Sequence, residues 1–302
     1  MQHTSKTRIL FLFALLFLIA PKKSSAQFYM YNLKYAQGLS EGTLYIVMPN
    51  PTSPKEKAFV DMYNKYWTMS KVQFIKPSEQ KKYLVQGNYF LEIVIMKAGS
   101  LNHTDKDIYL QLYQCISKSG EDKILVMVPL FQVATDVPDN SPTLIYETNT
   151  NQRNWGVGIF RNYILQIQSL LKEEKETLPT KTVANDAELA KLKSSTLFVP
   201  DYVLIDYNYD KASADEKKKI TEKIFQNYPS EYEIITTNEL NNKILNENEP
   251  FYYLVLVTGH ADNTVSIVNS STGEVIFNDT YSAYNKLDNH HLKSLISKLK
   301  SI

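Results

Sequence analysis

The spacing of apolar positions repeats in the two halves of the chain, displaced by about 160 residues. Each half contains three short apolar runs typical of strands, at residues 44–48, 72–75 and 89–96 in the first half and 203–206, 232–235 and 251–257 in the second. The third run of each half is almost continuously apolar, as expected for a strand that is covered on both faces. The pattern predicts two copies of one structural unit.

Helix-start signals follow the first strand of each half. Both signals have the spacing of a capping box, formed by Ser53 and Glu56 in the first half and by Ser213 and Glu216 in the second. In a capping box the Ser hydroxyl and the Glu carboxylate each accept a hydrogen bond from the backbone N–H of the other residue. Apolar side chains then recur at nearly four-residue spacing, at Phe59, Tyr63 and Trp67 and at Ile220, Ile224 and Tyr228. We therefore expect one helix after each box, with one face packed against a sheet.

The remaining signals in each unit are those of a short helix, of a hairpin after the third strand and of a closing helix. In the first unit they lie at 78–85, 108–128 and 160–171, and in the second unit at 238–245, 265–278 and 292–299. The predicted fold class is α/β: two tandem β-α-β-α-β-β-α units, each a mixed sheet flanked by helices. Right-handed crossovers would place the parallel strands in the order second, first, third. Two unrelated α/β domains whose signals coincide are the alternative. The element order is similar to that of small α/β domains of bacterial envelope proteins such as the N-terminal domain of TolB, which implies the fold class alone.

The N-terminus has the features of a secretory signal peptide. Lys6 and Arg8 precede an apolar run over 9–20, and Ser24, Ser25 and Ala26 supply small residues for cleavage. The run makes about 18 Å of helix against a hydrocarbon core of roughly 30 Å, so we expect no transmembrane helix after cleavage; an uncleaved anchor is the alternative. The expected domain plan is a signal peptide over 1–26, a first α/β domain over 27–173, a linker over 174–195 and a second α/β domain over 196–302.

Charge and cysteine content narrow the function and the compartment. The 302-residue chain has 33 basic and 32 acidic side chains, and removing residues 1–26, with four basic and no acidic side chains, leaves 29 against 32. No basic excess remains to neutralise phosphates, which argues against nucleic-acid binding. Cys115 is the single cysteine. An exported chain without an intramolecular disulfide is typical of the bacterial periplasm or of a protein secreted by bacteria.

Polar side chains of the second unit form a candidate site. Asp206 and Asp210 follow its expected first strand, and His260 and Asp262 follow its third. Ligands of open α/β sheets bind between such loops, and these side chains could hold a divalent cation or support general acid/base catalysis. The competing interpretation is solvated turn residues, since Asp bonds readily to its own backbone. The corresponding segment of the first unit, 48–52, has no carboxylate. We therefore expect no cofactor, with a divalent cation as the alternative.

Tyrosines crowd the expected mature N-terminus, at Tyr29, Tyr31 and Tyr35. They indicate either a strand packed on the first domain or a surface for a protein or glycan partner. The leading functional hypothesis is a non-catalytic interaction or scaffold protein of the bacterial cell envelope, whose partner is another envelope protein or a second copy of the chain. The alternatives are a periplasmic metal-dependent hydrolase and a carbohydrate- or peptidoglycan-binding protein.

Four other features have structural interpretations. Gly156 and Gly158 indicate close helix packing rather than a phosphate loop. His290 and His291 are adjacent and are expected at the surface. Glu92, inside the apolar third strand, is expected on a partly open face or beside a basic partner. The glycosylation sequons at residues 102, 269 and 278 are attributed to chance in an Asn-rich chain.

Overall fold

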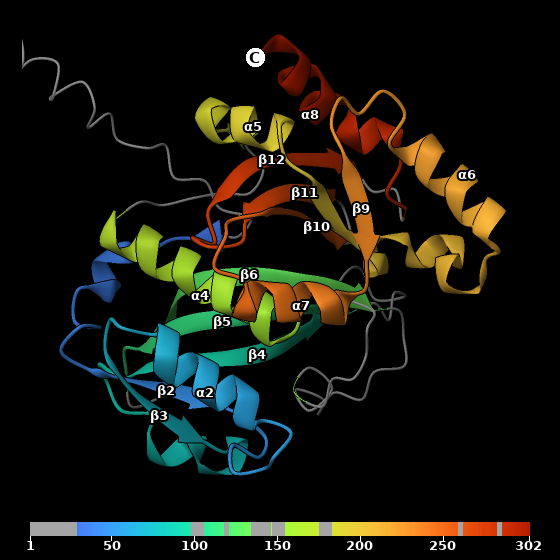
Figure 1. The fold of residues 1–302 in the computed structure, drawn as a ribbon. Coiled ribbons are helices and arrows are strands. Elements are labelled where there is room, and N and C mark those ends of the chain that lie inside the picture. The colour runs from blue at the N-terminus through green and yellow to red at the C-terminus, as the bar shows by residue number, and fades with distance from the viewer. Residues whose placement is uncertain are drawn as a thin grey trace, which may run out of the picture.

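The computed structural model describes residues 29–97, 106–117, 121–133, 146, 155–174, 183–258, 262–282 and 286–302. These residues form a mixed α/β structure with two six-stranded sheets (Figure 1). In the described part of the chain no helix combines the length and the apolar character needed to cross a membrane.

The first sheet has the strand order β1-β6-β5-β4-β2-β3. Its strands are β1 (Tyr29–Met30), β2 (Thr43–Val47), β3 (Lys71–Ile75), β4 (Tyr89–Lys97), β5 (Lys106–Cys115) and β6 (Asp122–Val133). Strand β2 runs parallel to β3 and β4, and the other pairs are antiparallel. The helical elements of this half are η1 (Leu33–Ala36), α2 (Lys57–Tyr66), η2 (Pro77–Lys82) and α4 (Val157–Lys172).

The second sheet has the same order and strand directions, β7-β12-β11-β10-β8-β9. Its strands are β7 (Val183–Ala184), β8 (Leu197–Pro200), β9 (Tyr232–Ile235), β10 (Tyr252–Thr258), β11 (Asp262–Asn269) and β12 (Val275–Ser282). Its helical elements are α5 (Asp186–Lys193), η3 (Asp201–Tyr207), η4 (Tyr209–Lys211), α6 (Ala214–Ile224), α7 (Thr237–Asn246) and α8 (Asn289–Ser301). In both sheets the three parallel strands lie in the order second, first, third along the chain.

Each sheet also contains a leading two-residue strand that the apolar pattern does not reveal. Strand β1 pairs with β6, and β7 pairs with β12. Strand β7 and helix α5 lie within the segment expected as a linker, 174–195, and Asn185 caps α5 by accepting the Glu188 N–H at 3.3 Å. A two-residue strand is too short to show an alternating pattern, so only its pairing defines it.

The first strand of the second half is not where the sequence predicts it. Residues 203–206 belong to the 3-10 helix η3, and the strand is β8, which ends at Pro200. Proline has no N–H with which to continue a ladder, so the chain turns there. The run that resembles a strand is apolar because Val203 and Leu204 are buried in the hydrophobic core of the second half. Short apolar runs do not distinguish a strand from a helical turn.

The two capping boxes also differ. Ser213 and Glu216 form both predicted bonds at the start of α6. In the first half the Glu56 N–H donates to Ser53 Oγ at 3.2 Å, but the Glu56 carboxylate accepts the Asn50 N–H at 3.0 Å, and α2 begins only at Lys57. The preceding turn thus competes with Ser53 for the carboxylate, which delays the helix by one turn.

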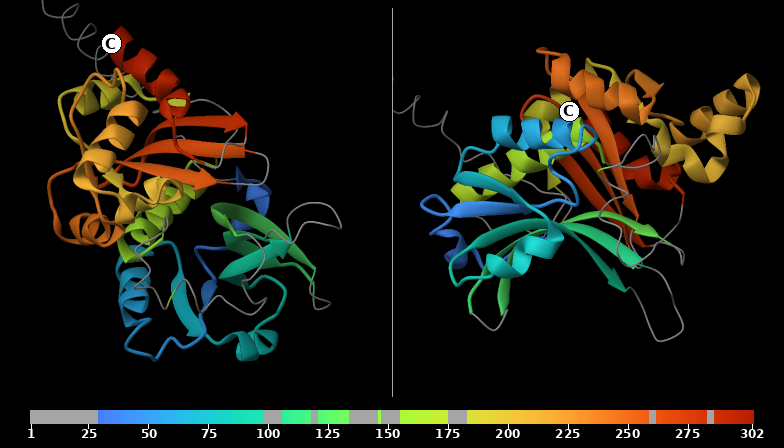
Figure 2. Two further views of the ribbon diagram at one scale, coloured as in Figure 1. Left: turned by 90° about the vertical axis from the view of Figure 1, so that its right-hand side faces the viewer. Right: turned by 90° about the horizontal axis from the view of Figure 1, so that it is seen from below.

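Helix α4 lies between the two sheets in both views of Figure 2. It carries buried side chains around most of its circumference, as expected of a helix covered on all sides. Its Gln168 side chain bonds to the end of α2 through the Tyr66 carbonyl (2.8 Å) and the Thr68 N–H (2.7 Å), and Asn162 donates to the Tyr253 hydroxyl of β10 (2.9 Å). One hydrophobic core therefore includes side chains from both halves.

Glycines allow α4 to approach α7 closely. A Cβ atom added at Gly158 would lie 2.6 Å from the Asn241 carbonyl oxygen. Gly156 has a φ of 138°, a conformation that L-residues with side chains rarely adopt, and a Cβ there would meet the Asn241 side chain. The interpretation of these glycines as helix-packing residues is confirmed.

The structure also shows where the histidine pair and two of the glycosylation sequons lie. The prediction for the histidine pair is wrong for His291, which is fully buried, whereas His290 is exposed. Neighbouring helical positions differ by about 100°, so one of the two turns inward at the start of α8. Asn269 and Asn278 are buried, in agreement with chance as the origin of their sequons; residue 102 lies outside the described residues.

Candidate functional site

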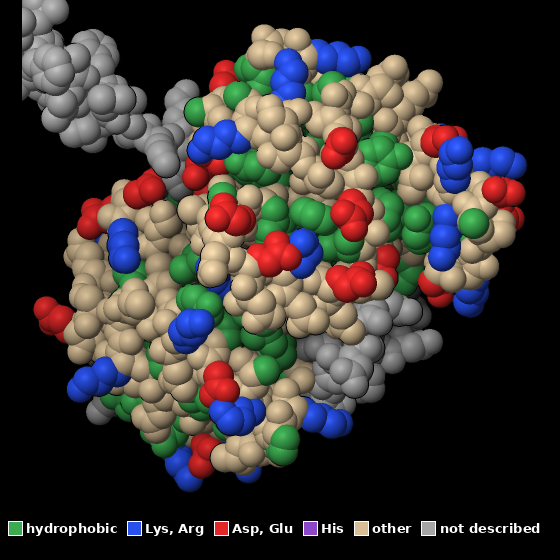
Figure 3. All heavy atoms as spheres, in the orientation of Figure 1, with side chains coloured by type: hydrophobic (Ala, Val, Ile, Leu, Met, Phe, Trp, Pro, Cys, Tyr) green, Lys and Arg blue, Asp and Glu red, His purple; other side chains and the backbone are tan. Residues whose placement is uncertain are grey.

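A groove of about 530 Å³ opens at the carboxyl ends of β8 and β9. Asp201 and Tyr202 enter it from the end of β8, Ile234 and Ile235 from β9, and Glu239 from the first turn of α7, while η3, η4 and α6 supply the rest of its wall. In Figure 3 apolar side chains reach the surface between α7 and α6, with acidic side chains on the α7 side.

The acidic side chains near α7 hold the start of that helix. Asp201 Oδ1 accepts the Thr237 N–H and the Thr237 hydroxyl, both at 3.0 Å. Thr236 and Glu239 form a capping box, with the Thr236 N–H donating to Glu239 Oε2 at 2.8 Å and the Glu239 N–H donating to Thr236 Oγ1 at 3.1 Å. Burial raises the pKa of Asp201 despite its hydrogen bonds, and the bonds from Thr236 lower the pKa of Glu239. These helix N–H donors are engaged, so the helix start has little capacity to bind an anion.

Tyr202 closes the space between β8 and β10 beyond the end of β8. Its hydroxyl accepts the Leu256 N–H at 2.9 Å and donates to the Leu256 carbonyl at 3.2 Å. The side chain thus replaces the main chain of β8 as the hydrogen-bonding partner of β10. Burial raises the pKa of Tyr202, so its phenol stays neutral. The groove therefore lies between the first and second parallel strands, not between the first and third, where the sequence places the site.

The groups that face the opening are apolar or charged. Ile205 is 40% exposed, Tyr209 is half-buried and Asp210 is exposed. Lys217 Nζ lies 5.2 Å from the centroid of the Tyr209 ring, a cation–π geometry. Among the lining residues, the three carboxylates of Asp201, Asp210 and Glu239 outnumber the single ammonium of Lys217. The groove is suited to bind a ligand that combines an apolar group with a positive charge.

The four predicted cation ligands do not all lie in this groove. Asp210 lines it, whereas Asp206 lies in η3 near Tyr207, whose hydroxyl donates to the Leu287 carbonyl at 2.8 Å. His260 lies outside the described residues, and Asp262 begins β11. Within the described part of the chain no group of three His, Cys, Asp or Glu side chains could hold a metal ion.

The three N-terminal tyrosines pack on the first sheet. Tyr29 lies in β1, and its ring centroid is 6.5 Å from that of Tyr31. The Tyr31 hydroxyl donates to Met127 Sδ at 3.0 Å, and the Tyr35 carbonyl accepts the Tyr89 hydroxyl at 2.8 Å. This arrangement agrees with the interpretation of the segment as a strand packed on the first half.

Glu92 lies half-buried on the outer face of the same sheet, so the expectation of a partly open face is confirmed. Gln80 Nε2 donates to Glu92 Oε2 at 2.8 Å and to the Tyr113 hydroxyl at 2.9 Å. Burial raises the pKa of Glu92, against the lowering effect of its hydrogen bonds with Gln80 and Tyr113. Cys115 is buried nearby, and its Sγ donates to the Ser117 carbonyl at 3.2 Å. The Gln80 bonds hold η2 against the sheet. Cys115 has a structural role as a buried side chain.

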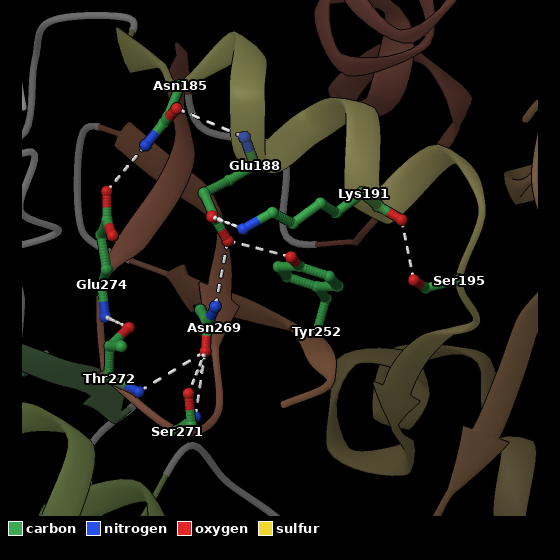
Figure 4. A network of polar contacts seen from close by, with 9 residues as sticks. All are labelled: Asn185, Glu188, Lys191, Ser195, Tyr252, Asn269, Ser271, Thr272 and Glu274. Carbon is green, nitrogen blue, oxygen red and sulfur yellow. Dashed lines mark hydrogen bonds and ion pairs between the residues drawn. The ribbon is translucent and has the colours of Figure 1, made fainter. Parts of the chain in front are cut away.

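A second polar network, shown in Figure 4, was not predicted from the sequence. The Glu188 carboxylate on α5 accepts hydrogen bonds from Lys191 Nζ (2.6 Å), the Tyr252 hydroxyl (2.9 Å) and Asn269 Nδ2 (3.1 Å). Burial alone would raise the pKa of Glu188, but these bonds outweigh it and the pKa is lowered. Because Tyr252 is the first residue of β10, the network lies at the opposite end of the parallel strands from the groove. It fastens α5 to the sheet.

Comparisons with protein-family models, with curated proteins and with solved structures find no match to this chain.

Proposed function

We propose that this chain is an exported, non-catalytic interaction or scaffold protein of the bacterial cell envelope, and that the groove of the second sheet is its contact surface. The supporting observation is that some side chains of the groove are bound to neighbouring elements of the fold, whereas others face the opening. Asp201 and Tyr202 are bound to α7 and β10, whereas Ile205 and Asp210 face the opening. Such a surface recognises a partner through an apolar contact with a charged border.

The export part of the proposal rests on the sequence of residues 1–26. Cleavage after Ala26 would leave Gln27 as the first mature residue and release the protein to the periplasm or the medium. The mass of the protein purified from its native host tests this directly. A mass that retains residues 1–26 would instead indicate an uncleaved anchor.

The two-unit part of the proposal is that both halves descend from one duplicated unit, with domains over 27–173 and 196–302, the second of which is completed by β7 and α5 from the segment between them. The shared strand order of the two sheets supports it. Duplication supplies two similar scaffolds, and the groove described above belongs to the second. The partner is another envelope protein or a second copy of the chain.

Site-specific photocrosslinking in intact envelopes tests the interaction role. A photoreactive residue in place of Ile205 should give one stoichiometric adduct, and Asp210→Lys in the same chain should abolish it. Val85, an apolar residue of the first half that is 48% exposed, provides the control position. Equal adducts from both positions, or turnover of a hydrolase substrate by the purified monomer, would contradict the proposal.

A further inference from the structure

The edge of the second sheet lies beside the groove. We propose that β9 and the groove together bind an extended peptide segment of the partner protein, which adds as a strand to β9 and places an apolar side chain and a lysine or arginine in the groove. This inference rests on the proposed function and identifies the chemistry of its partner as a basic, β-forming segment.

The backbone of β9 offers hydrogen-bonding groups at its outer edge. The Leu197 N–H donates to the Glu231 carbonyl at 3.0 Å, and β8 and β9 are parallel, with Leu197 opposite Tyr232 and Val199 opposite Ile234. In a parallel ladder each residue bonds to the two neighbours of its opposite residue, so the main-chain groups of residues 231, 233 and 235 face β8. Those of Tyr232 and Ile234 therefore point outward.

No strand among the described residues pairs with this outer side, because β9 is the last strand of its sheet. Figure 1 shows β9 at the sheet edge, between α7 and α6. An added strand would satisfy the outward N–H and C=O groups of Tyr232 and Ile234. Side chains of a strand alternate between its two faces, so the peptide side chains on the same face as Ile234 would be directed toward the part of the groove that Ile234 lines.

The negative charge of the groove and of the β9 edge favours a basic peptide. Asp210 is exposed in the groove, Glu233 is exposed on β9, and Glu231 is exposed immediately before it. Lys217 is held over the Tyr209 ring. A basic side chain in the groove gains a carboxylate partner at Asp210, and its neighbour on the same face of the peptide covers the exposed apolar surface of Ile205.

The first sheet provides an internal control, since β3 is its equivalent edge strand. The Met48 N–H donates to the Ile75 carbonyl at 2.9 Å, so by the same alternation the main-chain groups of Val72 and Phe74 point outward. The charge of this edge is opposite, because Lys71 and Lys76 are exposed there. A basic peptide is therefore expected to bind at β9 and not at β3.

The test uses the mature chain with isotope-labelled amides and the synthetic seven-residue peptide Val-Thr-Lys-Thr-Val-Thr-Lys, in which valine and lysine alternate along one face of the strand. We expect the peptide to shift the amide resonances of Tyr232 and Ile234 and to leave those of Val72 and Phe74 unchanged. The same peptide with glutamate in place of lysine, and a lysine peptide N-methylated at alternate residues, should each bind at least tenfold more weakly. Ile205→Asp and Asp210→Lys should weaken the lysine peptide by a similar factor, whereas Val85→Asp should not.

Each contrary outcome overturns a stated part of the inference. Equal binding of the N-methylated peptide would rule out strand addition, and equal binding of the glutamate peptide would rule out charge selection. Equal shifts of the β3 amide resonances would rule out the groove as the feature that directs the peptide to β9. Thermal melting confirms that each variant is folded. Absence of peptide binding together with a crosslink from position 205 overturns the peptide inference alone, whereas absence of both overturns the proposed function as well.

Discussion

Asn241 Oδ1 accepts the Ile159 backbone N–H at 3.0 Å, so a side chain of α7 caps α4. The residue at the N-cap position of α4 is Gly156, which has no side chain to serve as a cap. The Asn241 amide is held in place by its own bond to the Thr237 carbonyl at 2.8 Å. The first turn of the helix that closes the first half is thus completed by a residue of the second half.

Replacing Asn241 should therefore destabilise both halves together. Asn241→Ala removes the acceptor from a buried N–H, which costs about 1–2 kcal/mol. Urea unfolding followed by tryptophan fluorescence, which reports the first half through Trp67 and Trp155, and by far-UV circular dichroism, which reports both halves, should give coincident transitions at a lower midpoint. Asn246→Ala is the control on the same helix, because Asn246 is exposed and its amide donates to the Asn242 carbonyl at the surface. Equal effects of the two substitutions would contradict the capping role.

Gly158→Ala distinguishes packing from helix propensity. Alanine normally stabilises a helix by about 1 kcal/mol relative to glycine. At this position the new Cβ would lie 2.6 Å from the carbonyl oxygen and 2.9 Å from the Cα of Asn241, both backbone atoms that cannot rotate away. We expect a net loss of about 1–3 kcal/mol from overpacking, measured in urea. Ser169→Ala, at an exposed position of α4, should change the stability by less than about 0.5 kcal/mol. A stabilised Gly158→Ala variant would contradict the close approach.

Sequence patterns predicted elements whose residues determine their own conformation. Strand β9 spans Tyr232–Ile235 as predicted, and the box at Ser213 and Glu216 starts α6. The predictions failed where a residue outside the segment, either a nearby strand break or a distant pairing partner, determines its conformation. Residues 203–206 are helical because Pro200 ends the strand before them, and β7 is a strand only through its pairing with β12.

The groove was predictable only in part. Its general location, the carboxyl edge of the second sheet, follows from the α/β pattern, and Asp210 was identified as a candidate residue. The contribution of Tyr202 was not, because its bonds to Leu256 join residues 54 positions apart. Asp201 was missed since the sequence placed the strand beyond it. No local sequence pattern shows that Asp201 bonds to Thr237, because the two residues are 36 positions apart.

The Glu188 network predicts a loss of stability in acid. The pKa of Glu188 is below its ordinary value of 4.5 in the folded protein, so the unfolded chain binds the proton more tightly. The stabilisation is present above about pH 4.5 and is lost as the pH falls through the lowered pKa. Glu188→Gln should lose roughly 1–3 kcal/mol at pH 7 and differ less from the wild type at pH 3. Urea midpoints at the two pH values measure this, and a constant difference would contradict it.

The contribution of Glu92 to the pH dependence of stability has the opposite sign. Its pKa is raised in the folded protein, so the folded state binds the proton more tightly and stability declines as the pH rises from about 4.5 through the raised pKa. Glu92→Gln keeps an acceptor for Gln80 without the charge. We expect the variant to be more stable than the wild type at pH 8 and to lose this advantage at pH 4. Glu222→Gln, on the exposed surface of α6, is the control and should have little effect at either pH. A Glu92→Gln variant that is less stable at pH 8 would show that the carboxylate is needed in its charged form.

Divalent cations separate the proposed function from the metal-dependent hydrolase. A cation at 100 times its dissociation constant stabilises the folded state by about 2.7 kcal/mol, or roughly 5–10 °C in Tm for a chain of this size. Asp210 and Asp206 lie in different surroundings, one in the groove and one near Tyr207. We therefore expect Ca²⁺, Mg²⁺, Mn²⁺ and Zn²⁺ to leave the Tm unchanged, and EDTA likewise. A rise in Tm that disappears in both Asp206→Asn and His260→Ala would instead show that the two loops bind one ion, and would favour the hydrolase. Binding lost in Asp210→Asn alone would place the ion in the groove, where it would compete with the basic peptide for the same carboxylate.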